Sequence, residues 1–390
     1  MDFKTYAVLP AAGTGERMGL QTPKQYCMVH GRPLITYMLR TLDSIEWISG
    51  IVLAVSRDRL AFMKEIIDKY QYTKVQLVEG AASRHRTIKK CLESIPATAL
   101  PDVVILHDAV RPFANENVLS KVSQAAYEHG ACGAIQPLVS TVISPTQDGF
   151  LSHCLVRSNY TASHTPQAFR LTVMTTAYSK ATEQDLDHGT ECLELALKYT
   201  GTRAKLIQDD GDIWKVTYKR DLYAADGLAK EIHTRVAIFQ TNSSDINQAL
   251  EEKLCKKGLQ VVAVCSKVCD IPESANSVVL CTNAFTEEVV STVENIASIL
   301  QARCQYGGSL VMVVSNGNSS AEREVSEKSR EFCQSLSQRV RSSGLCINVV
   351  IATEENSNPD SLRNDVAAMV TDLIFNQNAI FSGQVFQLPS

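Results

Sequence analysis

The sequence Leu9-Pro10-Ala11-Ala12-Gly13-Thr14-Gly15-Glu16-Arg17-Met18 directly follows the first apolar segment of the chain. Glycines at such a position let the backbone turn tightly and bring its N–H groups close to phosphate oxygens. A dinucleotide-binding fingerprint would need a third glycine where Met18 stands, and an acidic residue about 20 residues further on. The segment Ser56-Arg57-Asp58 comes far too late for that role. The stretch therefore indicates a phosphate-binding loop of another kind, or a plain tight turn.

Apolar and amphipathic segments alternate along the chain after this loop. The continuous apolar runs predict buried strands, and apolar residues spaced by three and four predict helices. This alternation predicts an α/β fold whose mostly parallel sheet is covered by helices on both faces. The predicted strands are 6–10, 51–56, 75–78, 103–106 and 133–137, and the predicted helices include 34–42, 59–70 and 85–94.

Residues 138–165 interrupt the alternation. The segment 139–144 alternates like a strand, Thr146-Gln147-Asp148-Gly149 contains an Asp-Gly turn, and 151–156 is typical of a return strand. These signals predict a β-hairpin. An antiparallel arm on a parallel sheet is often a docking element, so we expect a docking arm here.

A second domain is predicted after a closing helix at 217–230. Its strands are expected at 235–239, 259–265, 277–281, 309–315 and 345–351. We therefore expect a boundary near residue 232, with one domain at 1–232 and a smaller α/β domain at 233–390. The sequence of this second domain shows no phosphate loop, metal cluster or nucleophile constellation. It is expected to be non-catalytic and to support the first domain by packing or dimer contact.

Two basic residues accompany the glycine-rich loop. Arg17 lies within it, and Lys24 follows in Thr22-Pro23-Lys24-Gln25. Arginine binds forked oxygens and lysine acts as a point charge, so the pair would make a polyphosphate clamp. Most such side chains are solvated surface charges, and that alternative stays open. A proline beside Lys24 would hold it on a stiff turn, which favours the clamp.

Acidic residues follow two further segments. Asp108, in Leu106-His107-Asp108-Ala109-Val110-Arg111-Pro112, comes at the carboxyl end of a predicted strand, where open α/β sheets bind ligands. It could hold the magnesium that accompanies a nucleoside triphosphate, or it could cap a turn. Asp212-Ile213-Trp214-Lys215-Val216-Thr217 supplies another acid and a lysine. The loop from Gly80 to Thr87 could hold a pyrimidine against its backbone, or Ser83 could simply cap the next helix.

Composition excludes some classes of function. The 390 residues carry a net charge of -4, which disfavours broad nucleic-acid binding. The 12 cysteines are scattered without the paired spacing of a zinc site, and most stand in apolar or helical stretches, as buried thiols do. The N-terminal stretch shows no signal-peptide apolar region of adequate length, and no segment approaches the ~20 apolar residues of a membrane helix. We expect a reduced, cytosolic protein without membrane or nucleic-acid partners.

Five segments in order resemble the family of 2-C-methyl-D-erythritol 4-phosphate cytidylyltransferases and their pentitol-phosphate relatives, over roughly residues 5–230. The segments are 10–18, Pro23-Lys24-Gln25, His107 to Pro112, Thr165-Pro166-Gln167 and Lys215-Val216-Thr217. The resemblance implies a Rossmann-like nucleotidyltransferase domain that uses CTP and Mg²⁺. It also implies a homodimer joined through the arm. The extra C-terminal domain is similar to that of the animal members of the family. It implies D-ribitol 5-phosphate or a close pentitol phosphate as acceptor, for the O-mannosyl glycan of dystroglycan.

The resemblance also implies a role for each matching residue. Catalysis falls to Arg17, Lys24, Asp108 and Lys215, and the metal to Asp108 and Asp212. Substrate binding falls to Arg111, Thr141, Arg157 and Thr190, with Arg157 reaching the acceptor phosphate in the neighbouring subunit. Nucleotide binding falls to Ala11, Ala12, Gly13, Thr14, Gly15, Gly80, Arg84 and Thr87.

One departure affects the acceptor. Bacterial erythritol enzymes typically have Thr-Asp-Glu where this chain has Gly189-Thr190-Glu191. Thr190 can both donate and accept a hydrogen bond, unlike the aspartate it replaces. A 2-C-methyl-D-erythritol 4-phosphate cytidylyltransferase therefore remains the main alternative. A non-catalytic nucleotide-binding scaffold is another, although the basic residues disfavour it. An NAD-dependent reductase is disfavoured because no Gly-x-Gly-x-x-Gly follows the strand at 235–239, and no lysine stands four residues after Tyr306.

Overall fold

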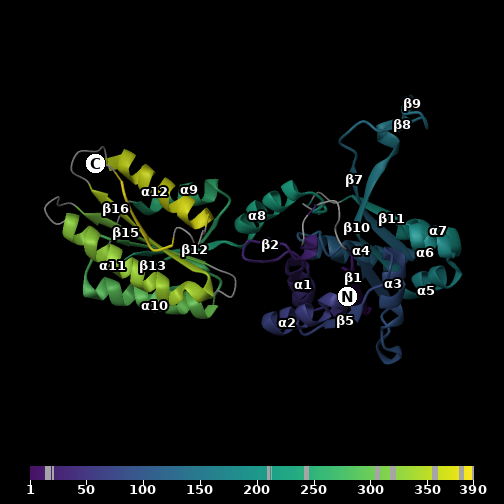
Figure 1. Cartoon of the computed structure of the whole chain (residues 1–390), viewed down its shortest axis with the longest axis horizontal. Helices are drawn as coiled ribbons and strands as arrows, with labels where there is room; N and C mark the ends of the chain where they lie inside the picture. Colours follow the sequence, from purple (N-terminus) through teal and green to yellow (C-terminus); the bar gives the residue numbers. More distant parts are fainter. Residues whose placement is uncertain are drawn as a thin grey trace. The chain divides into compact units, whose positions relative to one another are not determined.

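The structure is a computed structural model that describes residues 1–13, 19, 22–208, 211, 213–240, 246–303, 308–316, 322–353, 359–376 and 382–388. It consists of two compact units (Figure 1). The first comprises Met1–Met28 and Arg32–Leu222, and the second comprises Val29–Gly31 and Tyr223–Ser390. The division falls inside helix α8 (Lys219–His233), whereas the sequence pattern placed a boundary near residue 232, at the end of that helix.

A central sheet organises the first unit. Its strands are β1 (Thr5–Pro10), β4 (Ile48–Val55), β5 (Val75–Glu79), β6 (Val103–Leu106), β7 (Ala131–Pro137), β10 (Thr161–Arg170) and β11 (Lys205–Gln208). Within the described ranges their order is β11-β7-β10-β6-β1-β4-β5. The pairs are parallel except those of β10, which runs antiparallel to both β6 and β7. The expected α/β class is confirmed, with one reversed strand inside the sheet.

Helices bury the strands of this sheet, as the continuous apolar runs predicted. They are α1 (Ile35–Ser44), α2 (Leu60–Tyr70), α3 (Arg84–Glu93), α4 (Glu116–His129), α5 (Leu171–Lys180), α6 (Glu183–His188) and α7 (Cys192–Thr200). Ala7, Val8 and Leu9 are fully buried, so both faces of β1 are covered. One apolar cluster joins α3, α5 and α7 to strands β1, β4, β6 and β10. A short sheet pairs β2 (Met28–Val29) with β3 (Arg32–Pro33).

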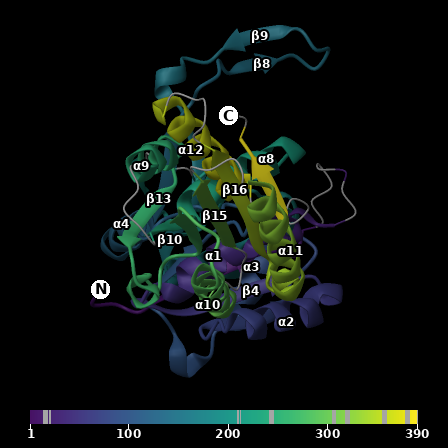
Figure 2. The ribbon, with the colours of Figure 1, turned by 90° about the vertical axis from the view of Figure 1, so that its left-hand side faces the viewer.

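The hairpin predicted at 138–165 is present but shorter than expected. Strands β8 (Ile143–Pro145) and β9 (Leu151–Cys154) pair antiparallel, with Ile143 opposite Cys154 (Figure 2). The turn between them is closed by the Gly149 N–H, which donates to the Thr146 carbonyl, and Gly149 has φ +89°. Val139, Phe150 and Val156 are exposed on this arm.

The second unit has a parallel sheet of its own. Its strands are β12 (Arg235–Gln240), β13 (Gln260–Cys265), β14 (Ser277–Thr282), β15 (Gly308–Asn316), β16 (Leu345–Thr353) and β17 (Gln384–Gln387), in the order β13-β12-β14-β15-β16-β17. One apolar cluster packs α10 (Glu287–Arg303) and α11 (Glu322–Val340) on one face, and another packs α9 (Ile246–Lys256) and α12 (Pro359–Asn376) on the other (Figure 1).

Two further observations concern the described ranges only. None of their helices is long and apolar enough to cross a bilayer. Their cysteines are all free thiols, and most are buried.

Candidate active site

The loops that follow β1, β5 and β6 surround a cavity of about 600 Å³ at the carboxyl ends of these strands. This is the edge of an open α/β sheet at which ligands bind. The volume is that of a site for a drug-sized or nucleotide-sized ligand. The lining residues are Pro10, Ala11, Ala12, Gly13, Lys24, Gln25, Ala81, Ala82, Ser83, Arg84, Thr87, Asp108, Ala109, Val110, Lys215 and Thr217.

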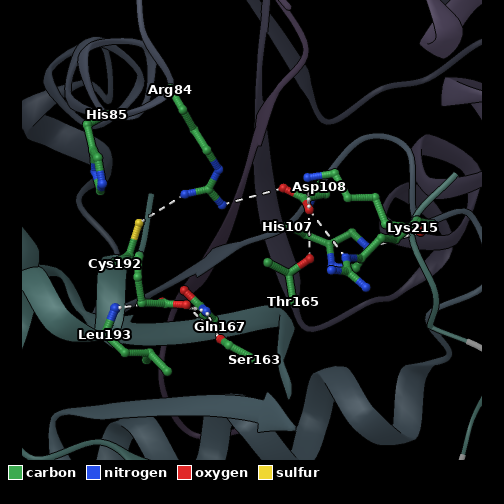
Figure 3. A network of polar contacts seen from close by, with 12 residues as sticks. Arg84, His85, His107, Asp108, Ser163, Thr165, Gln167, Cys192, Leu193 and Lys215 are labelled. Atoms are coloured by element: carbon green, nitrogen blue, oxygen red, sulfur yellow. Dashed lines mark hydrogen bonds and ion pairs between the residues drawn. The ribbon is translucent and has the colours of Figure 1, made fainter. Parts of the chain in front are cut away.

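Asp108 is the centre of a charged network in this cavity (Figure 3). One carboxylate oxygen lies 3.0 Å from the Lys215 ammonium and 3.2 Å from Arg111 Nε. The other lies 3.4 Å from the Arg84 guanidinium. The backbone N–H of Asp108 donates to the Thr165 hydroxyl on β10 at 3.1 Å. Arg111, from the same loop as Asp108, and Arg84 and Lys215, from more distant segments, thus surround one carboxylate.

These cations set the charge of the site. Burial alone would raise the pKa of Asp108, but the charges of Lys215, Arg84 and Arg111 outweigh it and hold the pKa well below its ordinary value. Asp108 is therefore ionised at neutral pH and cannot act as a general acid. Three cations against one carboxylate leave the cavity wall positive, which suits phosphate groups.

The start of the glycine-rich loop is braced by Gln25. Its amide nitrogen donates to the carbonyls of Ala11 and Gly13, both at 2.8 Å, and the residue is only 3% exposed. Lys24, next to it in a short 3-10 helix, donates to the Val216 carbonyl at 3.1 Å and lines the cavity. Lys24 therefore stands on a short turn between Pro23 and Gln25, and Gln25 is anchored to the glycine-rich loop.

The loop after β5 is also held from within. The Thr87 hydroxyl donates to the Ser83 carbonyl at 2.8 Å and accepts from the Ala81 N–H at 3.0 Å. The Ser83 side chain accepts from the Arg86 N–H and so caps α3. The expected helix cap by Ser83 is present, and Ser83 also lines the cavity, where pyrimidine binding by this loop stays a prediction. An ideal Cβ on Gly80 would lie 2.4 Å from the Ala12 Cβ, so glycine permits the two loops to approach.

We expect Gly80→Ala to lower the free energy of unfolding by about 1–3 kcal/mol, the usual cost of overpacking. It should also weaken nucleotide binding, because the added methyl pushes the two cavity loops apart. Urea unfolding and CTP titration measure the two effects. Gly227→Ala is the matched control, because nothing lies within 4 Å of its added Cβ in helix α8. Equal unfolding free energies and equal CTP affinities in the two variants would contradict the close approach of Gly80 to Ala12.

Arg111 faces inward rather than into the cavity. It is 7% exposed, pairs with Asp108 and donates to the Ile213 carbonyl at 2.7 Å. Arg84 likewise makes a second contact, from its guanidinium to the buried Cys192 thiol at 3.3 Å. Both arginines are therefore held on two sides, which fixes the charges around Asp108.

The structure thus brings some of the expected site residues together and leaves others apart. Those that line one cavity are Ala11, Ala12, Gly13, Lys24, Arg84, Thr87, Asp108 and Lys215. Gly80 and Arg111 support this lining. Thr141, Arg157 and Thr190 are exposed and lie outside it. Thr14, Gly15, Arg17 and Asp212 lie outside the described residues.

Gln25 and Thr217 are among the lining residues that were given no role of their own from the sequence. Gln25 and Thr217 each flank a predicted site lysine, in Lys24-Gln25 and Lys215-Val216-Thr217. Their adjacency to those lysines was the available signal. Gln25 donates to the carbonyls of Ala11 and Gly13, and Thr217 contacts Lys215 and Asp221, so their roles follow from the folded loops and not from a motif.

Comparison with known proteins gives consistent matches. Residues 5–231 match the family described as IspD, 2-C-methyl-D-erythritol 4-phosphate cytidylyltransferase. The D-ribitol-5-phosphate cytidylyltransferase of Xenopus tropicalis is 38% identical over 97% of this chain and 96% of its own length. The human protein of the same name is 49% identical over 67% of this chain. The match spans 60% of the human protein's length and 61% of the rat protein's.

The bacterial relatives match a smaller share of this chain. The 2-C-methyl-D-erythritol 4-phosphate cytidylyltransferase of Syntrophus aciditrophicus is 32% identical over 60% of this chain and all of its own length. Among solved structures, the 4-diphosphocytidyl-2C-methyl-D-erythritol synthase of Anaerococcus prevotii has a TM-score of 0.50 at 23% identity. That comparison covers 58% of this chain and 96% of the other, and it supports the fold of the first unit.

Proposed function

Because this chain belongs to the 2-C-methyl-D-erythritol 4-phosphate cytidylyltransferase family, we propose that it transfers CMP from CTP to D-ribitol 5-phosphate or a close pentitol phosphate. The family indicated by the five sequence segments is confirmed by these matches. We propose this acceptor because the relatives named for it match more of the chain, and at higher identity, than the bacterial erythritol enzymes do. The products would be CDP-ribitol and pyrophosphate.

The observation that carries the proposal is the group of cations on one cavity wall. Lys24, Arg84 and Lys215 line the same space beside the glycine-rich loop, and Asp108 is the counter-ion of Arg84 and Lys215. A nucleoside triphosphate and a phosphate monoester together bring several negative charges to such a site. Fixed cations stabilise that charge without reorganising during the reaction.

The chemistry needs no covalent enzyme intermediate. A phosphate oxygen of the acceptor attacks the α-phosphorus of CTP, a new P–O bond forms, and the bond to the β-phosphate breaks. Pyrophosphate leaves with the electron pair. The side chains contribute positioning and charge stabilisation, as in phosphoryl transfer generally. Lys24 would stabilise the leaving pyrophosphate, and Lys215 would hold the acceptor phosphate.

Magnesium is part of the proposal. Within the described ranges, no group of three or more His, Cys, Asp or Glu side chains could hold a metal ion. Asp108, whose oxygens also pair with Lys215, Arg111 and Arg84, would offer the ion one carboxylate, and phosphate and water would supply the other ligands, as is common for Mg²⁺. Bound there, Mg²⁺ would draw negative charge from the phosphate oxygens. Asp212, the other expected ligand, lies outside the described residues.

The acceptor phosphate would also use a second subunit. Thr141 and Arg157 are exposed on the arm, and Arg157 donates to the Val139 carbonyl at 2.7 Å. The exposed apolar side chains of the arm support a docking role. We therefore extend the proposal to a cytosolic homodimer, supplying activated ribitol phosphate for protein O-mannosylation, in which Arg157 completes the partner's site.

Subunit mixing tests the shared site. Arg157→Ala and Lys24→Ala chains should each be inactive, yet a mixture should recover up to about a quarter of wild-type activity after exchange. The reason is that half the dimers are mixed, and each mixed dimer holds one intact site of two. The rate of CDP-ribitol formation is the measurement. If the mixture stays inactive after subunit exchange has been confirmed, the result would count against the shared site.

Pyrophosphate release tests the function itself. The full chain is incubated with CTP and Mg²⁺, and with either D-ribitol 5-phosphate or 2-C-methyl-D-erythritol 4-phosphate. We expect a higher kcat/KM for the ribitol compound, because a site built to bond a hydroxyl rejects an analogue that lacks it. Equal values or the reverse preference would replace this acceptor by the erythritol one. No pyrophosphate release with any polyol phosphate would favour the scaffold alternative.

A further inference from the structure

The segment Ile213–Tyr218, called the strap below, crosses the cavity edge without regular secondary structure and ends at helix α8. It carries Lys215, which reaches Asp108 at 3.0 Å, and Thr217, which lines the cavity. A segment outside helix and sheet has no ladder of backbone hydrogen bonds to hold it. What fixes the strap therefore decides where Lys215 stands.

The first half of the strap is held by residues of the site. Arg111 donates to the Ile213 carbonyl at 2.7 Å. The Val216 N–H donates to the Val110 carbonyl at 2.9 Å, and the Val216 carbonyl accepts from the Lys24 ammonium at 3.1 Å. The strap thus links the loop after β6 to both site lysines.

The second half is held by one carboxylate oxygen of Asp221. Asp221 Oδ2 accepts the Thr217 N–H and the Tyr218 N–H, both at 2.8 Å. Its other oxygen lies 3.8 Å from Arg220 Nε, and the Arg220 side chain is 83% exposed. A contact of that length to a solvated arginine contributes little. The two backbone bonds are therefore what Asp221 supplies.

We propose that Asp221 is a positioning residue, which holds Lys215 and the Val216 carbonyl in place through the backbone of Thr217 and Tyr218. In this proposal Asp221 contacts neither CTP nor the acceptor. The inference rests on the proposed function, because it concerns the place of the lysine assigned to the acceptor phosphate. The plainer alternative is that Asp221 caps helix α8 and affects stability alone.

Two variants of Asp221 separate the positioning role from the capping role. In Asp221→Ala both backbone N–H groups lose their acceptor, so the second half of the strap is released while the contacts of the first half remain. We expect kcat/KM for D-ribitol 5-phosphate to fall about 10–10²-fold, because misplacement by about 1 Å has effects of that size. The KM for CTP should change less, since Gln25 still braces the glycine-rich loop. In Asp221→Asn a single amide oxygen can take the place of Oδ2 and accept both N–H groups, so activity should return to near wild type.

A capping residue elsewhere is the matched control. Thr286 accepts the Val289 N–H at the start of α10 in the second unit. Thr286→Ala should lower the unfolding midpoint, as loss of a cap does, while both kinetic constants stay unchanged. Amide hydrogen exchange at Thr217 and Tyr218 supplies a readout independent of activity. Protection should be lost in Asp221→Ala and kept in Asp221→Asn.

The outcomes are separable. Normal kcat/KM in folded Asp221→Ala, with an active wild-type chain, would overturn the positioning role and leave the capping one. An equal loss in the alanine and asparagine variants would also overturn it, because the charge and not the two hydrogen bonds would then matter. An inactive wild-type chain would instead refute the proposed function, while the exchange measurement would still report on the strap.

Discussion

We expect the Lys24→Ala variant to turn over about 10²–10³-fold more slowly than the wild-type chain, the effect of removing one preorganised charge-stabilising donor. Lys24 lines the cavity beside the loop whose carbonyls Gln25 braces. Charge grows on the departing pyrophosphate in the transition state, so the loss should appear in kcat more than in CTP binding. Pre-steady-state measurement of CDP-ribitol formation, together with CTP titration, separates the two.

The control for Lys24 is another lysine of the same unit. Lys90 is exposed on α3, so Lys90→Ala removes the same charge without touching the cavity. It should leave turnover unchanged. We expect Arg17→Ala to match Lys24→Ala, on the strength of its place in the glycine-rich loop. Near-normal turnover in folded Lys24→Ala would reject the polyphosphate clamp.

The alternation of apolar and amphipathic segments predicts much of the fold, because burial on both faces of a strand leaves a visible apolar run. Strand β6, which is wholly buried, shows this directly. Strand β10 does not show it. Its first half is largely exposed, and Pro166 offers no N–H to a neighbouring strand, so its pairing with β7 is irregular between Ser163 and Gln167. Its reversed direction depends on contacts with β6 and β7 that no local pattern contains.

The candidate site could be predicted to a similar extent. Motif positions identified Lys24, Asp108 and Lys215, because each stands where a strand or turn must deliver a side chain to the sheet edge. Sequence could not say that Arg111 turns inward to the Ile213 carbonyl, since its partner is 102 positions away. Nor could it place Thr190, which is exposed and outside the cavity lining.

The largest loss of stability is expected for Asp108→Ala. The variant would leave Arg84, Arg111 and Lys215 facing one another without their shared counter-ion. The Arg111 side chain is only 9% exposed, so its charge cannot turn to water. Removing one partner of a buried ion pair typically costs about 3–5 kcal/mol. Turnover should fall at least as far as in Lys24→Ala, because two site cations lose their positions together.

Asp108→Asn separates the charge of the carboxylate from its shape, and pH supplies the diagnostic. The folded chain holds the pKa of Asp108 below the unfolded value of about 3.9. The stabilisation from ionised Asp108 is therefore complete above about pH 4, and it is lost as the pH falls through the folded pKa. The difference in unfolding free energy between wild type and Asp108→Asn should be the same at pH 7 and pH 5 and smaller at about pH 3. Urea unfolding at the three pH values measures it. A difference that grows in acid would show that the cations do not stabilise the ionised carboxylate, and the charged network would lose its central member.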